Sequence, residues 1–128
     1  MPASVKVDVK SGIVYSSFEG ALNDNDILTH RDVLKSHPNF NPQFSEIVDF
    51  TGVTHLKVTV GLINSMAKSD SLYSPESRHA VIAPHDMTYG VARLYQMLAL
   101  ETRPNVAVVR SMAEAHRFVG IEPQTSGQ

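Results

Sequence analysis

The hydrophobic residues at the start of the chain follow a spacing that predicts strands. Val5, Val7 and Val9 alternate with charged residues, which is the period of two expected of a strand with one buried face. A turn at Ser11-Gly12 follows, and residues 13–19 have the character of a second strand. The two segments therefore predict an antiparallel hairpin.

Helix signals and short apolar runs then alternate along the rest of the chain. Asn23, followed by acidic residues, is typical of a helix N-cap, Asp86 has the same position before a second helix, and Ser111 to Glu114 has the form of a capping box. We expect helices in residues 22–36, 58–68 and 86–101 and from 111 onward. We expect strands in residues 47–50, 80–83 and 106–109, with a turn at Thr51-Gly52 after the first of these.

This order predicts an α/β fold with a mixed, mostly parallel sheet and an N-terminal antiparallel hairpin. The continuous apolar runs at 80–83 and 106–109 indicate strands that are buried on both sides, so helices must cover the two faces of the sheet. No internal repeat or linker divides the chain. We expect one domain over residues 1–120 and a flexible tail over 121–128, which is rich in Pro, Ser, Gly and Gln.

Composition and charge leave the predicted fold unchanged, but they argue against several kinds of partner and location. The net charge is -2 over 128 residues, and there is no basic surplus to neutralise phosphates, which argues against a nucleic-acid partner. The chain has no cysteine and no apolar stretch that resembles a signal peptide or is long enough to span a bilayer. We therefore expect a cytoplasmic protein with no transmembrane segment.

The common catalytic motifs are absent from the sequence. It contains no G-x-S-x-G, no phosphate-binding P-loop, no G-x-G-x-x-G and no H-E-x-x-H. Its six histidines lack the paired spacing with carboxylates that metal sites need, so we expect them in loops or on the surface. No metal or cofactor is predicted.

Polar residues near the ends of two predicted core strands are the candidates for a binding site. Asp49 ends one strand and could act as a base or ion ligand, although Asp and Thr are also common turn residues. His85 and Asp86 follow another strand, where ligands bind in open α/β sheets, although Asp86 has a simpler role as a helix cap. Hydroxyl and rim residues complete the candidate site, namely Thr51, Thr54, Thr59, Tyr89 and Arg93.

Five segments together resemble the SpoIIAA-like, or STAS-like, group of domains over about residues 5–120. They are Phe18-Glu-Gly-Ala-Leu-Asn-Asp, Ile47-Val-Asp-Phe-Thr-Gly-Val, Arg78-His-Ala-Val-Ile-Ala-Pro, Tyr89-Gly-Val-Ala-Arg-Leu-Tyr-Gln and Ala115-His-Arg-Phe-Val-Gly. The resemblance implies a regulatory or ligand-binding module. In STAS-type anti-sigma-factor antagonists a helix opens with an Asp-Ser-Ser-Gly motif whose serine accepts phosphate. Here the matching segment is Lys57-Val-Thr-Val-Gly, which lacks the Asp-Ser pair and leaves Thr59 as the candidate phospho-acceptor.

Three hypotheses about function follow. The first is a non-enzymatic module that binds a protein partner or a small apolar or anionic ligand. The second is a small enzyme that uses Asp49 and His85 as an acid–base pair. The third is a homodimer formed through helix faces or an exposed sheet edge.

Overall fold

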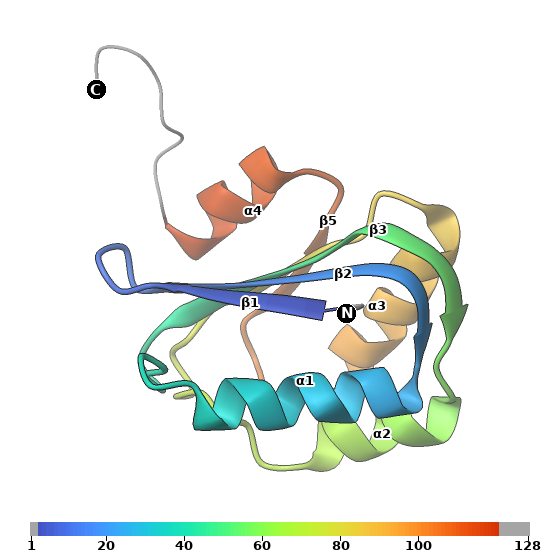
Figure 1. Cartoon of the computed structure of the whole chain (residues 1–128), viewed down its shortest axis with the longest axis horizontal. Helices are drawn as coiled ribbons and strands as arrows, with labels where there is room; N and C mark the ends of the chain where they lie inside the picture. Colours follow the sequence, from blue (N-terminus) through green and yellow to red (C-terminus); the bar gives the residue numbers. More distant parts are fainter. Residues whose placement is uncertain (1–2, 121–128) are drawn as a thin grey trace.

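A five-stranded sheet with four helices makes up the part of the chain that the computed structural model describes, residues 3–120 (Figure 1). The strands are β1 (Ala3–Asp8), β2 (Ile13–Asn23), β3 (Ser45–Lys57), β4 (His79–Ile82) and β5 (Val106–Val109). The helices are α1 (Asp24–Ser36), α2 (Val60–Lys68), α3 (Asp86–Leu98) and α4 (Met112–Val119). The expected order of elements is confirmed. The expected tail at 121–128 lies outside the described residues.

The strands lie in the sheet in their chain order, and only the first pair is antiparallel. β1 pairs with β2 as a hairpin, and β2 to β5 are parallel neighbours. This confirms the mixed, mostly parallel sheet. Parallel strands in sequential order, joined by crossovers of one hand, place their connecting helices on one face.

Three helices cover one face of the sheet and one helix covers the other. Figure 1 shows α1, α2 and α3 on one side and α4 on the opposite side. The alternation of side chains along the strands supplies a core to each layer: Ile47 and Ile82 pack against α4, whereas Val14 and Val81 pack toward the three-helix side.

The second and third strands are longer than the sequence analysis predicted. β3 continues through the expected turn at Thr51-Gly52, and β2 continues past residue 19 to Asn23. The pairing between these strands shifts register in the segment around Gly20, whose φ of 75° is accessible mainly to glycine. A Cβ on Gly52 would lie 2.9 Å from the Cβ of Glu19. A glycine is therefore needed here because β2 and β3 lie close together, and not because the chain turns.

Helix starts agree with the sequence analysis at two positions and differ at two. Asn23 caps α1 in a reciprocal box with Asp26, and Ser111 caps α4, as predicted. The predicted cap at Asp86 is wrong: His85 occupies the N-cap position of α3 without a side-chain bond, and Asp86 is the first helical residue. α2 begins two residues later than predicted, because Thr59 is its N-cap.

Candidate functional site

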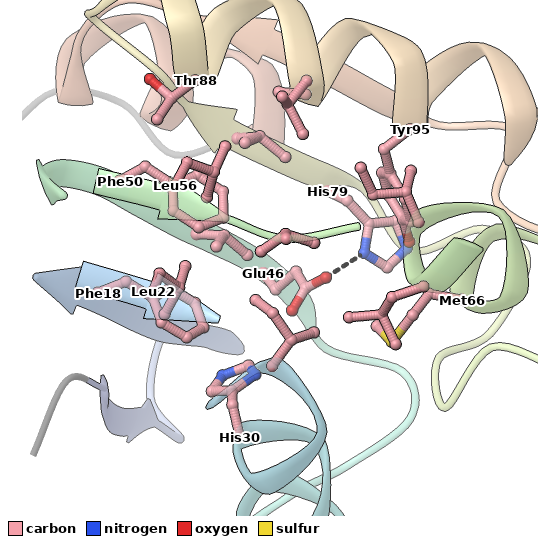
Figure 2. A pocket seen from close by; sticks show the side chains of 18 residues that line it. Phe18, Leu22, His30, Glu46, Phe50, Leu56, Met66, His79, Thr88 and Tyr95 are labelled. Atoms are coloured by element: carbon pink, nitrogen blue, oxygen red, sulfur yellow. Dashed lines mark hydrogen bonds and ion pairs between the residues drawn. The ribbon is translucent and has the colours of Figure 1, made fainter. Parts of the chain in front are cut away.

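A cavity of about 170 Å³ lies between the sheet and the three helices α1, α2 and α3 (Figure 2). Its wall is predominantly aliphatic and aromatic. The apolar lining comes from three strands, three helices and the β3–α2 connection, and consists of Phe18, Leu22, Ile27, Val48, Phe50, Leu56, Val58, Leu62, Ile63, Met66, Val81, Val91 and Ala92. Cavities of about 150 Å³ hold molecules the size of benzene, so this one has room for a small organic molecule.

The cavity is a departure from normal core packing. Protein interiors are packed as densely as organic crystals, with few voids larger than a water molecule.

One end of the cavity carries a buried carboxylate–imidazole pair. Glu46 of β3 and His79 of β4 are direct partners in the parallel pairing, and both point to the three-helix face. The imidazole Nδ1 lies 2.8 Å from Glu46 Oε1, and the hydroxyl of Tyr73 donates to Glu46 Oε2 at 3.0 Å. The ring of Tyr73 also packs edge-on against the imidazole of His79, with centroids 5.0 Å apart.

The hydrogen bonds decide the charge of this pair. Burial favours the neutral form of Glu46, but the bonds and charge interactions from His79, the charge interaction with His30 and the bond from Tyr73 outweigh it and hold the pKa of the carboxyl below its ordinary value. The carboxylate is therefore ionised and accepts both bonds. Nδ1 of His79 is then the protonated nitrogen, so in the neutral imidazole Nε2 carries a free lone pair.

The free nitrogen of His79 faces the cavity. The His79 residue is only 4% exposed, and no hydrogen bond joins its Nε2 to another described residue. Within residues 3–120 no fully enclosed side-chain nitrogen or oxygen lacks a partner, so Nε2 must border open space. The cavity is the space that His79 lines.

Two further polar side chains, which line the cavity close to this pair, are uncharged at neutral pH. His30 of α1 shares a hydrogen bond of 2.7 Å with the buried hydroxyl of Ser16, and desolvation lowers the pKa of its imidazole. Burial raises the pKa of Tyr95 on α3 to about 12, so its hydroxyl stays protonated. Figure 2 shows Glu46, His79 and Tyr95 toward one end of the cavity, with Leu22, Phe50 and Leu56 toward the other. His30 lies beside Phe18, with ring centroids 4.8 Å apart.

The predicted site residues on and after β3 lie outside this cavity. Asp49 accepts hydrogen bonds from the backbone N–H of Thr51, at 2.9 Å, and from the Thr51 hydroxyl, which is a turn-like local arrangement. Thr54 is exposed and contacts His55. Thr59 caps α2 by accepting from Leu62 N–H, and its own hydroxyl donates to Asp24 at 2.7 Å.

The predicted residues around α3 form a separate surface cluster. Arg110 lies 3.9 Å from the ring centroid of Tyr89 and 3.3 Å from the carboxylate of Asp86. His85 and Arg93 are exposed on the same helix or at its cap. The structure thus brings Asp86 and Tyr89 together through Arg110, but it places neither Asp49 nor His85 at the cavity.

The expectation that all histidines lie in loops or on the surface is wrong for three of them. His79 is buried within β4, and His30 and His116 are half-buried within α1 and α4. Their positions in the sequence show no metal-ligand spacing. No cluster of three or more His, Asp or Glu side chains that could hold a metal ion occurs among residues 3–120.

Comparison with known proteins identifies the fold. The sequence matches no family model and no curated protein. A solved structure matches with a TM-score of 0.58 at 13% identity, covering 91% of this chain and 93% of the other: an uncharacterised protein of the DUF3478 family with a SpoIIAA-like fold from Shewanella loihica PV-4. The present chain therefore has a SpoIIAA-like α/β fold, as its sequence indicated. None of the helices within residues 3–120 has both the length and the apolar character to cross a membrane.

Proposed function

We propose that this SpoIIAA-like domain is a non-enzymatic module that binds a small, mainly apolar ligand in the cavity between its sheet and α1–α3. The observation that carries the proposal is the cavity itself, an apolar space of about 170 Å³ with a polar group at one end. A pocket with apolar walls and a few convergent polar groups is the usual form of a small-molecule site. Its size fits a ligand of roughly six to ten non-hydrogen atoms.

The position of the cavity supports a regulatory role. Residues of α1, α2 and α3 line it together with three strands, so an occupant would contact elements far apart in the sequence. Filling the space stabilises the arrangement of these helices relative to the sheet. A ligand could in this way control the surface that a protein partner recognises.

Acid–base catalysis by Asp49 and His85 gains no support from the geometry. Asp49 is engaged by Thr51, and neither residue borders the cavity. The other parts of the functional hypothesis stay predictions: a protein partner, a cytoplasmic location and a homodimer. Light scattering over a concentration series tests the dimer, and a mass that stays at one chain contradicts it.

Phosphorylation of Thr59 also stays a prediction, and the structure defines its test. The Thr59 hydroxyl touches the carboxylate of Asp24, so a phosphate or a Thr59→Glu side chain would place like charges together between α1 and α2. Thr59→Glu should change the affinity for a partner recovered with the protein, whereas Thr54→Glu, on an exposed part of β3, should not. Equal affinities of both variants and the wild type would remove the phospho-switch.

The experiment for ligand binding compares the wild type with a variant whose cavity is partly filled. Ala92 lines the cavity from α3, and Ala92→Leu extends a side chain into it. Toluene at ten times its dissociation constant should stabilise the wild type by about 1.4 kcal/mol in thermal unfolding, and should stabilise Ala92→Leu much less. Wild-type protein that neither retains a compound after purification nor responds to toluene would refute the proposal.

A further inference from the structure

The polar end of the cavity presents acceptors to an occupant. With Nδ1 held as the donor to Glu46, the neutral form of the His79 imidazole presents a free lone pair at Nε2 to this space. Glu46 is ionised and also lines the cavity, and each of its oxygens still has acceptor capacity after accepting one bond. An occupant that offers only acceptors would find few matching groups here.

The charge of this wall selects against anions. With the imidazoles of His79 and His30 in their neutral forms, the carboxylate of Glu46 is the charged group on the lining. An anionic head group placed here would lose its hydration and meet a like charge at short range.

The same wall is a poor host for an ammonium group. Both oxygens of Glu46 already accept hydrogen bonds from Tyr73 and His79, so the carboxylate is largely compensated before any ligand arrives. An ammonium group has three hydrogen-bond donors and is strongly hydrated. The apolar lining replaces few of the hydrogen bonds to water that such a group loses on entering. An uncharged hydroxyl needs only one acceptor and loses far less hydration.

We infer that the cavity selects an uncharged ligand with a compact apolar body that ends in a single hydroxyl, which donates a hydrogen bond to His79 Nε2. This inference rests on the proposed ligand-binding function and narrows the ligand class from a mainly apolar molecule to a neutral alcohol or phenol. The apolar body lies against Phe18, Leu22 and Phe50, at the end opposite the imidazole (Figure 2).

A series of ligands of nearly equal size tests the inference on the wild-type protein. Benzyl alcohol, anisole, benzylamine and benzoate differ in the polar group, and toluene has none. Affinities measured by NMR titration should place benzyl alcohol about tenfold tighter than anisole and toluene, which corresponds to the worth of one hydrogen bond. Benzylamine and benzoate should bind more weakly than toluene.

The outcomes separate this inference from the function on which it rests. If toluene binds and benzyl alcohol is no tighter than anisole, or if benzoate or benzylamine binds best, the cavity is a ligand site but the inferred class is wrong. If no compound of the series binds, including toluene, the proposed function fails and the inference fails with it.

A charge-neutral variant tests the role of Glu46 separately. Glu46→Gln keeps the shape of the side chain and removes the charge, so benzoate should gain at least about fivefold in affinity while toluene is unchanged. Glu101→Gln, at an exposed glutamate after α3, is the matched control and should leave every affinity as in the wild type. Unchanged benzoate binding in folded Glu46→Gln would show that the carboxylate does not exclude anions.

Discussion

Replacing Ala92 with leucine asks whether the cavity is open space in the folded protein. Ala92 is 7% exposed, packs with Val81 and Val106 and also lines the cavity, so the added carbon atoms extend from this cluster into the open space. Three additional buried carbons contribute up to about 2.4 kcal/mol at about 0.8 kcal/mol each. Ordering the leucine side chain removes about 0.5–1 kcal/mol of this, so a net gain of about 1.5 kcal/mol is expected.

The matched control lies on the other face of the sheet. Ala115 of α4 is fully buried among Ile13, Ile47 and Ile82, and it does not line the cavity. Ala115→Leu adds the same atoms to a filled core and should destabilise the protein by about 1–3 kcal/mol. The two variants should therefore change stability with opposite signs.

Urea unfolding followed by circular dichroism measures both effects. Ala92→Leu should raise the urea midpoint at unchanged slope, and Ala115→Leu should lower it. If both variants lower the midpoint by similar amounts, the space beside Ala92 is filled in the native protein, and the reasoning about the cavity is refuted.

Three further predictions concern the groups around the cavity and the cap of α2. Desolvation lowers the pKa of His30 in the folded state, so the unfolded chain binds more protons as pH falls below the ordinary value of 6.5. The free energy of unfolding should therefore decline below this pH, and it should decline less in His30→Gln. Equal pH dependence in the two proteins would contradict a desolvated His30. The pKa of Glu46 is lowered in the folded state, so its contribution to stability should be present above the ordinary value of 4.5 and lost as pH falls below it. Glu46→Gln should lack this acid-dependent loss of stability. A wild type that loses stability in acid in the same way as the variant would count against an ionised Glu46. Thr59→Ala removes the cap of α2 and its bond to Asp24, so its free energy of unfolding in urea should fall by about 1–2 kcal/mol. The exposed Thr54→Ala should lower the free energy of unfolding by less than about 0.5 kcal/mol. Equal losses in the two variants would contradict the capping role of Thr59.

The layered architecture was predictable because it depends on local signals. The period of two in residues 5–9, the apolar runs at 80–83 and 106–109, and the cap at Asn23 each specify an element without knowledge of its neighbours. The length of β3 was not predictable in the same way. Thr51-Gly52 has the composition of a turn, and only the close approach of β2 shows why a glycine is needed inside a strand.

The polar end of the cavity was missed because its signal is tertiary. Glu46 precedes Val48 and Phe50 at the two-residue spacing of an inward face, and His79 precedes Val81 in the same way. A charged residue on such a face indicates a buried group with a hydrogen-bond or ion-pair partner, because buried charges need partners. The partner itself follows only from the register of β3 against β4, which pairs Glu46 with His79.

The predicted site residues and the cavity lie in different places because the prediction follows a general rule about sheets. Ligands of open α/β sheets usually bind outside the carboxyl ends of the strands, and this rule predicts a site at Asp49 and His85. Here all three crossover helices cover one face, and the open space lies between that face and the helices. The site is consequently lined by strand interiors, which sequence patterns assign to the core.

A crystal structure of the protein soaked with benzyl alcohol tests the central claim most directly. We expect density for the aromatic ring beside Phe18, Leu22 and Phe50 and for the hydroxyl oxygen within hydrogen-bond distance of His79 Nε2. A cavity closed by the side chains of Leu62 and Met66, with no density beside His79, would contradict the account.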